Sequence, residues 1–451
     1  HKEYRRQRQM CIRDSPITFS RYFIIDPVCA QVRGHNLASI EHFRNLLRDL
    51  TKGEAEILCF GSKELTITAP NSTPPYVNAL LSFNYSDIQF LATETGQRHH
   101  PSLHPYPIPL KMPFAHYKEE YSQEELRCIT SHHQGIREVA NLEMRELLTK
   151  TSAGKSDCIF FPSADIYAVL SVANALAQQS PSKSPTIVFK FIHVMEYWSP
   201  LPEDCLDLIF QTVAKLLRHG HDIRICTESP GYSEYLKSTY SLKSSPLPLP
   251  IPPMITEGLE NLNTDSRAVL FPGTQRFDKG LARIPGIIAS VNERSGLAGA
   301  EFVLQEPTHN DLEGSMQIYN EIMKYPNVTV FSSTLSDEKL RSLYMNAKCV
   351  CLPYCESTYD TFRSSGSYVE AASYCRPIAA TECKGFAETF KQHKLGNLAS
   401  KESDLATSII EMLDWNIDKF LDHRAHIERF FDHIKTSYSR IFSVNYNDQH
   451  I

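Results

Sequence analysis

Hydrophobic positions in the first half of the chain switch between short continuous runs and helical spacing. Runs at 22–25 and 56–60 predict buried strands, whereas apolar residues between 37 and 50 recur at the spacing of a helix. Further strands are predicted at 158–161, 186–189 and 223–226, with a helix at 206–217. Strands that alternate with helices predict a mostly parallel sheet covered by helices.

Prolines interrupt this alternation at 246, 248, 250, 252 and 253, where neither a helix nor a central strand is expected. The alternation then restarts. Strands are predicted at 268–271, 301–304, 328–331 and 349–352, and helices at 287–294, at 337–345 and from Tyr368. The pattern therefore predicts two doubly wound Rossmann-like domains that face a central cleft.

The domain boundaries follow from these patterns. We expect a first Rossmann-like domain at 16–245, a proline-rich linker at 246–262, a second domain at 263–414, and a helical tail at 415–451 that packs back on the first domain. Residues 1–15 are interpreted as a non-native leader, because 10–15 corresponds to the translated end of a transposon used in sequencing libraries.

Composition narrows the function classes. Hydrophobic residues make up 42% and charged residues 22%, which is typical of a folded globular protein. The formal net charge of −6 and the lack of a basic stripe argue against nucleic acid. Twelve scattered cysteines without a Cys-x-x-Cys pair favour a reducing, cytoplasmic location, and peripheral contact with the inner membrane surface is left open.

A first candidate site follows the strand at 268–271. Gly273 allows a substrate to approach the backbone, and Arg276 and Lys279, three residues apart, can meet a diphosphate from one loop. The alternative interpretation is an ordinary solvated turn.

A second candidate site follows the strand at 349–352. Ser364, Ser365 and Gly366 precede a helix, so free backbone N–H groups and the helix dipole favour an anion there. Glu370 lies in the first turns and can accept hydrogen bonds from sugar hydroxyls. The alternative is a capped helix with a Glu favoured by the helix dipole.

Together these two segments resemble the C-terminal half of glycosyltransferase family 4, whose members have the GT-B fold (group 1 glycosyl transferases). That family has a Gly-x-x-Arg-x-x-Lys-Gly loop after one strand and a Glu-Ala helix after another. The resemblance implies that Arg276 and Lys279 are catalytic and clamp the donor diphosphate, with Ser364, Ser365 and Gly366 as an anion nest.

The resemblance also implies that Glu370 anchors the donor ribose and that Gly273 and Gly34 lie close to the donor phosphates. One departure concerns the family's first glutamate, because Phe362 stands eight residues before Glu370. Glu356 and Asp360, which lie nearby in the sequence, are candidates to substitute for it, and His35 and His193 are further candidates for donor-sugar or acceptor contacts.

The resemblance implies a retaining, metal-independent hexosyltransferase of glycan, glycoconjugate or polysaccharide biosynthesis, without a cofactor. It would move a sugar from a nucleotide-diphosphate donor to a hydroxyl of a glycan, lipid-linked or small-molecule acceptor. The first domain would then be the acceptor side and the second the donor side. The alternative, motivated by Phe362, is a non-catalytic scaffold that binds sugar nucleotides in a polysaccharide assembly system.

Overall fold

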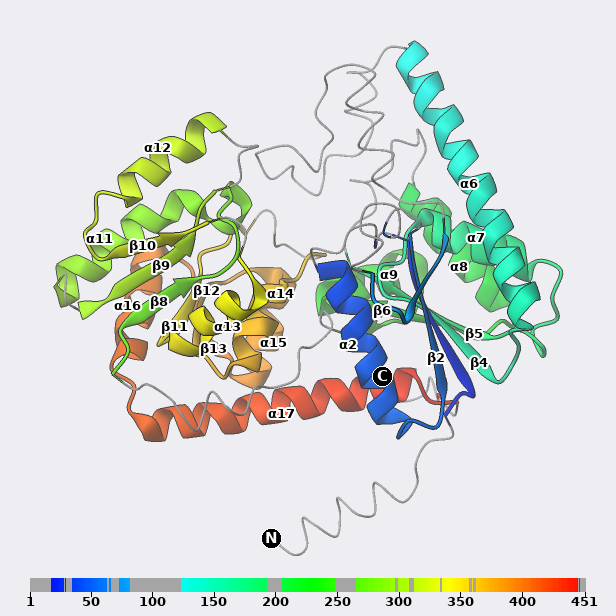
Figure 1. Ribbon diagram of the computed structural model, residues 1–451. Helices are drawn as coiled ribbons and strands as arrows, with labels where there is room; N and C mark the ends of the chain where they lie inside the picture. The colour runs from blue at the N-terminus through cyan, green and yellow to red at the C-terminus, as the bar shows by residue number, and fades with distance from the viewer. Residues whose placement is uncertain are drawn as a thin grey trace, which may run out of the picture.

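The computed structural model describes residues 18–27, 29, 35–62, 65, 73–81, 123–192, 205–247, 265–296, 299–307, 312–332, 335–356, 359, 362–444 and 446. The leader expected at 1–15 lies outside these residues. The described chain forms two sheets of parallel strands with helices around each sheet (Figure 1).

The first sheet has seven strands in the order β3-β2-β1-β4-β5-β6-β7, and every neighbouring pair is parallel. Alternate residues of β1 serve opposite faces, because side chains of a strand point to the two sides in turn. Phe23 and Ile25 pack with α7 and α8, whereas Tyr22 and Ile24 pack with α2. The elements are β1 (Arg21–Asp26), α2 (His35–Leu50), β2 (Glu56–Ser62), β3 (Val77–Leu81), α6 (Gln123–Thr151), β4 (Asp157–Phe161), α7 (Ile166–Leu176), β5 (Thr186–Phe191), α8 (Cys205–Arg218), β6 (Ile223–Thr227), α9 (Pro230–Tyr240) and β7 (Ser245–Pro246).

The second sheet has six strands in the order β10-β9-β8-β11-β12-β13, again all parallel. Its elements are β8 (Ala268–Phe271), the 3₁₀ turns η3 (Phe277–Lys279) and η4 (Leu281–Arg283), α11 (Ile284–Ser295), β9 (Glu301–Gln305), α12 (Leu312–Ile322), β10 (Val328–Phe331), α13 (Asp337–Asn346), β11 (Cys349–Leu352), α14 (Gly366–Ser373), β12 (Ile378–Thr381), α15 (Lys384–His393), β13 (Gly396–Ala399) and α16 (Glu402–Leu413).

Both sheets reverse their strand order at one point, between β1 and β4 in the first and between β8 and β11 in the second. In doubly wound sheets, ligands bind outside the carboxyl ends of the strands at such a switch point. The two candidate segments follow β8 and β11, so the fold brings them to the switch point of the second sheet.

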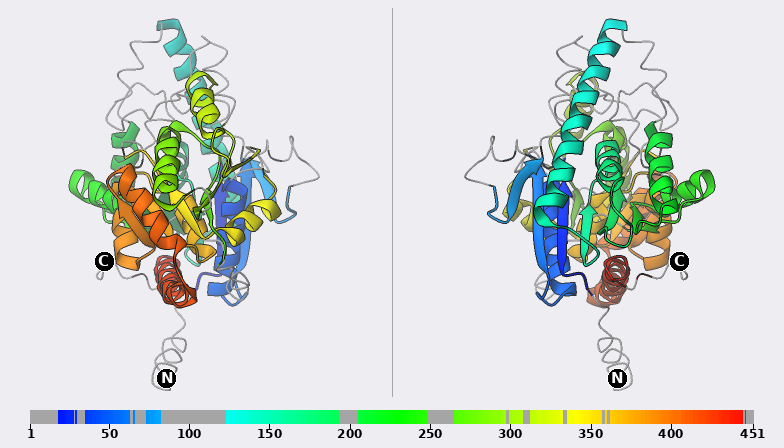
Figure 2. Two further views of the ribbon diagram at one scale, coloured as in Figure 1. Left: turned by 90° about the vertical axis from the view of Figure 1, so that its left-hand side faces the viewer. Right: turned by 90° about the vertical axis from the view of Figure 1, so that its right-hand side faces the viewer.

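A long C-terminal helix, α17 (Ile417–Ile441), runs from the second unit to the first, as two perpendicular sets of views show (Figures 1 and 2). Its buried stripe reaches both units. The Phe430 ring lies 6.4 Å from that of Tyr368 on α14, and the Tyr438 ring lies 5.4 Å from that of Phe43 on α2. The helix therefore joins the two units through one continuous hydrophobic cluster.

One boundary differs from the sequence-based expectation. Pro246 was placed in the linker, but Ser245 and Pro246 pair with β6 as the edge strand β7. Proline is tolerated there because an edge strand leaves one row of N–H groups unpaired. The rest of the expected linker, from residue 248 onward, lies outside the described residues.

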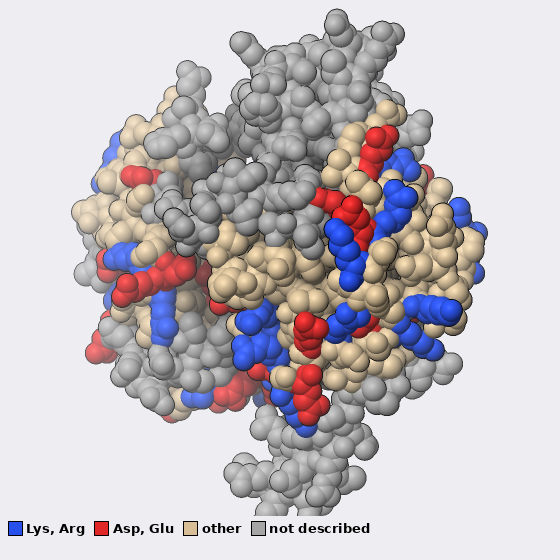
Figure 3. All heavy atoms as spheres, turned by 45° about the vertical axis from the view of Figure 1, so that its right-hand side comes forward, with Lys and Arg blue, Asp and Glu red and all other residues tan. Residues whose placement is uncertain are grey.

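Surface charge is mixed rather than segregated. On the face drawn in Figure 3, acidic and basic side chains are interspersed. Within the described part of the chain, no helix is both long and apolar enough to span a bilayer.

Candidate functional site

The loop after β8 is shaped by Gly273 and Gln275. Gly273 has a φ of +76°, a left-handed conformation that favours glycine. The buried Gln275 amide donates to the carbonyls of Phe271 and Gly273, at 3.0 and 2.8 Å, and so fixes the turn. A Cβ atom on Gly273 would lie 2.6 Å from the Lys279 ammonium, so this glycine makes room for the lysine head group.

Arg276 is engaged by a neighbouring carboxylate. Its Nε and Nη2 donate to the two Asp278 oxygens at 2.8 and 2.7 Å, a bidentate pair. Burial opposes the charged forms of both groups, but the mutual hydrogen bonds outweigh it, so the pKa of Arg276 is raised and that of Asp278 is lowered. Of the two cations predicted to clamp the diphosphate, Arg276 is thus already paired with a carboxylate of the protein, that of Asp278.

Lys279, in contrast, makes no hydrogen bond or ion pair with any residue that the structure describes. Its side chain is half-buried. Burial, followed by the positive charge of Arg276, lowers the pKa of its ammonium to about 8. A lysine without a partner beside a second cation is poised to receive an anionic ligand.

Gly280 lies where the loop that carries Arg276 and Lys279 meets the segment that follows β11. With a φ of +81°, it ends η3, and a Cβ atom here would lie 1.8 Å from the Pro353 carbonyl oxygen. The Cys355 N–H donates to the Asp278 carbonyl at 3.1 Å across the same junction. The backbone after β8 is therefore pressed against the backbone after β11, which brings the two candidate segments together.

The helix α14 begins as the sequence predicts. Ser365 is its N-cap and accepts from the Ser367 N–H at 3.2 Å, while its own hydroxyl donates to the buried Tyr354 hydroxyl. The exposed Gly366 is the first helical residue, and N–H groups of a first turn lack intrahelical acceptors. The first turn of α14 can therefore bind an anion.

Ser364 already donates a hydrogen bond to a carboxylate of the protein. Its N–H donates to the Glu228 carboxylate, 3.2 Å away, which comes from the loop after β6 in the first unit. Glu228 is only 6% exposed, and its pKa is raised by burial. Of the three predicted nest residues, Ser364 is thus used in a contact between the units.

Glu370 faces the same loop from α14. The Tyr344 hydroxyl donates to its carboxylate at 3.0 Å. Burial raises the pKa of Glu370, and the positive charge of Lys279 counteracts part of that rise, so the two side chains interact. A carboxylate that keeps one oxygen for a further donor suits a ligand hydroxyl.

Phe362, which stands where the resembled family has glutamate, packs against the first unit. Its ring meets those of Tyr232 and Tyr235 on α9 edge to face, with centroids 5.1 and 4.8 Å away. Position 362 is therefore an apolar contact between the units.

Sequence reasoning missed several polar groups at this junction. Lys190, at the end of β5, is fully buried, its Nζ has no hydrogen-bond partner in the described structure, and burial lowers its pKa. The charge of Glu228 partly compensates it. The sequence did carry a signal for these groups. A polar residue lies at the carboxyl end of each of two adjacent apolar strands, which is the edge of a parallel sheet where ligands bind.

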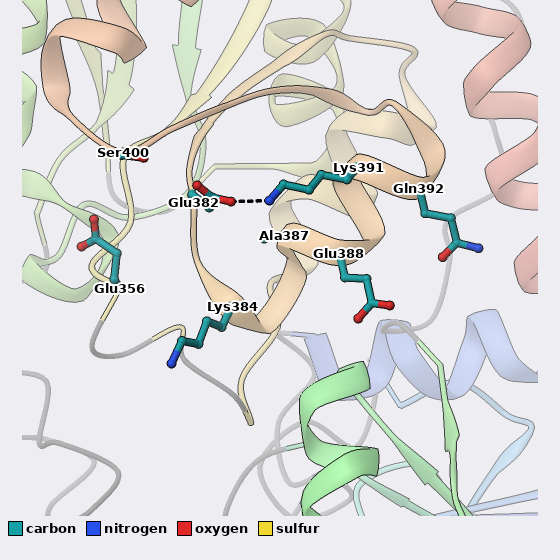
Figure 4. A pocket seen from close by; sticks show the side chains of 8 residues that line it. All are labelled: Glu356, Glu382, Lys384, Ala387, Glu388, Lys391, Gln392 and Ser400. Atoms are coloured by element: carbon teal, nitrogen blue, oxygen red, sulfur yellow. Dashed lines mark hydrogen bonds and ion pairs between the residues drawn. The ribbon is translucent and has the colours of Figure 1, made fainter.

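Glu356 follows β11 and lines a hollow that does not include Arg276, Lys279 or Glu370. It pairs with Arg283 at 2.7 Å and lines a hollow of about 860 Å³ over α15, together with side chains of both charges (Figure 4). Within the lining of that hollow, Glu382 pairs with Lys391. The lining comprises Glu356, Glu382, Lys384, Ala387, Glu388, Lys391, Gln392 and Ser400, and so contains no clamp residue.

Four predicted contacts cannot be placed by side chain. Gly34, His193 and Asp360 lie outside the described residues, and His35 begins α2 without a described side chain. Among the residues that are described, no three His, Cys, Asp or Glu side chains cluster in a way that could hold a metal ion.

Comparison with known proteins gives a likeness in structure only. No protein-family model matches the sequence, and no curated protein gives a significant match. Three solved structures are similar over 94% of this chain. They are the N-terminal domain of a Candida albicans trehalose-6-phosphate phosphatase (12% identity, 95% of that chain, TM-score 0.64), a glycosyltransferase from Rickettsia africae (12%, 98%, 0.59), and an E. coli structure described as trehalose-6-phosphate bound with UDP-2-fluoro glucose (11%, 98%, 0.58).

At these identities the likeness concerns the fold. The chain has the GT-B fold, with two doubly wound Rossmann-like units, and the fold class predicted from the sequence is confirmed.

Proposed function

We propose that this protein is a glycosyltransferase that moves a sugar from a nucleotide-diphosphate sugar to a hydroxyl acceptor. The single observation that carries the proposal is the half-buried Lys279, without a partner among the described residues, between Arg276 and Glu370 at the switch point of the second sheet. A diphosphate supplies the anion that this lysine lacks, and a ribose supplies hydroxyls for Glu370.

The chemistry requires stabilisation of negative charge as the sugar leaves. In the proposal, Lys279, Arg276 and the first turn of α14 receive the departing diphosphate, which lowers the barrier to an oxocarbenium-like transition state. These cations and the helix dipole supply the positive charge, so the proposal assigns no divalent metal and no cofactor. Arg276 would exchange Asp278 for a phosphate, or share its fork between them.

The acceptor belongs, in this proposal, on the side of the first unit. Its strand ends bring Lys190 and Glu228 towards α14, and Glu228 touches Ser364. Retention of configuration, membership of glycosyltransferase family 4, a hexose as the transferred sugar and a role in glycan or glycoconjugate biosynthesis in the cytoplasm are parts of the proposal that rest on the motif resemblance. Of the similar structures, one is a glycosyltransferase and another is described as bound with UDP-2-fluoro glucose, and this supports the reaction class.

A thermal-shift panel with UDP, GDP, ADP and their common sugars tests donor binding. A ligand at about 100 times its Kd stabilises a protein by about 2.7 kcal/mol, which is readily measured. We expect one nucleotide to stabilise the wild type, Lys279→Ala and Arg276→Ala to reduce that shift strongly, and Lys435→Ala, on the exposed side of α17, to retain it. No shift with any nucleotide would refute the proposed donor site.

The second candidate is the non-catalytic sugar-nucleotide scaffold, favoured by the apolar contact that Phe362 makes in place of a glutamate. A scaffold would show the same thermal shift but release no nucleoside diphosphate from the bound nucleotide sugar. Product release therefore separates the two functions.

A further inference from the structure

Arg363 is a third cation at this site, and its donors are available. Its Nη1 lies 3.7 Å from an Asp278 oxygen, too far for a hydrogen bond, while Asp278 is already held bidentately by Arg276. Its guanidinium lies over the Tyr359 ring, 4.9 Å from the centroid. The side chain is 40% exposed and makes no hydrogen bond with a described residue.

The residues on both sides of Arg363 hold its backbone against the first unit. Phe362 packs on the tyrosines of α9, and the Ser364 N–H donates to Glu228. These contacts fix the backbone of Arg363, and the Tyr359 ring supports its guanidinium. Such a cation is set in place before a ligand arrives, so binding to it costs little ordering of the side chain.

The charged groups of the site lie close enough to act on one another. The charge of Lys279 acts on the pKa of Glu370, and that of Arg363 acts on the pKa values of Lys279 and Glu228. Arg363 therefore lies near both Lys279 and Glu228, beside the Asp278 carboxylate that Arg276 also binds and next to the contact between the units. A ligand whose ribose binds Glu370 and whose first phosphate binds Lys279 can therefore bring its second phosphate to Arg363.

We infer that Arg363 binds the distal, sugar-linked phosphate of the nucleotide-diphosphate donor, as a third cation beside Arg276 and Lys279. Asp278 acts as the internal counter-ion that holds Arg276 and Arg363 near each other until the phosphate arrives. This inference rests on the proposed donor site and adds to it a residue and the part of the donor that it contacts.

The test measures affinities of matched mono- and diphosphates for the full chain by calorimetry. UDP, GDP and ADP are compared with UMP, GMP and AMP, and the pair that binds the wild type is carried forward with its nucleotide sugar. The variants are Arg363→Ala, Arg363→Lys and the control Arg294→Ala, whose guanidinium contacts Thr407 between α11 and α16. A melting temperature equal to that of the wild type, measured without ligand, shows that each variant folds.

Arg363→Ala should weaken the diphosphate and the nucleotide sugar about tenfold or more, equivalent to about 1.4 kcal/mol, and leave the monophosphate unchanged. Arg363→Lys should recover part of the loss, because it keeps the charge but not the fork. Arg294→Ala should match the wild type.

Equal affinities of Arg363→Ala and wild type for the diphosphate would overturn the inference. So would a loss confined to the nucleotide sugar, since that would place the contact on the sugar, or an equal loss for the monophosphate. Failure of the wild type to bind any of the diphosphates would instead refute the proposed donor site.

Discussion

Substitution of Gly280 by alanine should disable the donor site. The residue adopts a φ of +81°, and its Cβ would lie 1.8 Å from the Pro353 carbonyl oxygen and 2.6 Å from the carbonyl carbon. Both atoms belong to the backbone, so no side-chain rotation can relieve the overlap. An ordinary contact of 3.4 Å would require the two loops to separate by about 1.6 Å.

The expected magnitude has two parts. A residue with a Cβ in left-handed conformation costs about 1–2 kcal/mol. Forcing extra volume into a packed contact costs a further 1–3 kcal/mol or so. Because misplacement by about 1 Å can lower a rate roughly 100-fold, the shift of Lys279 should reduce donor turnover by about two orders of magnitude.

Gly296 supplies a control for the backbone cost. Its φ of +73° and ψ of 163° also form a conformation that favours glycine, in the same unit, but a Cβ there meets nothing within 4 Å. Gly296→Ala should therefore show the conformational cost alone, with donor affinity and turnover close to the wild type. The assays are thermal unfolding and release of nucleoside diphosphate from the nucleotide sugar. If Gly280→Ala and Gly296→Ala had the same donor turnover, the packing argument would be wrong.

Three further predictions concern neighbouring groups. Nucleotide affinity should be full below a pH of about 8 and fall as the pH rises through the lowered pKa of Lys279, a dependence that Lys279→Met should remove in calorimetric titrations. Tyr344→Phe removes the donor to Glu370 and should weaken a nucleotide less than tenfold, while sparing inorganic pyrophosphate in the same assay. Phe362→Ala should remove the ring contacts with Tyr232 and Tyr235 and lower the free energy of unfolding by about 1–3 kcal/mol in denaturant titration, because the side chain is partly buried, whereas an unchanged midpoint would show that the units are held together elsewhere.

Much of the fold could be predicted because its signals are local. The strand expected at 268–271 is β8, and the helix expected at 337–345 is α13 with one more residue, since each has its own hydrophobic run or spacing. Helix α6 and strand β3 were not predicted. Strand β3 is only five residues long, and α6 carries many polar residues and a glycine, Gly135, so neither has a strong hydrophobic pattern of its own.

The site was predictable where one loop carries it. Gly273, Arg276 and Lys279 lie within one turn, so their spacing alone brings them together. The pairing of Arg276 with Asp278 was not predicted, because residues two apart meet only in a tight turn and do not face each other on a helix.

Partners from distant strands could not be foreseen. Glu228 reaches Ser364 across 136 residues, and Arg283 reaches Glu356 across 73, so both contacts depend on the tertiary arrangement. Nearness to Glu370 in the sequence suggested Glu356 as a sugar contact, and that role stays a prediction, while the side chain pairs with Arg283.

Release of nucleoside diphosphate from a panel of UDP-, GDP- and ADP-sugars tests the central claim most directly. The measurement compares the wild type with Lys279→Met, each with and without a mixture of hydroxyl acceptors. We predict that one nucleotide sugar is consumed by the wild type, faster with acceptor, and that Lys279→Met is slower by at least tenfold. Binding of a nucleotide sugar without any release, by a wild type that is folded and saturated, would contradict the claim of catalysis.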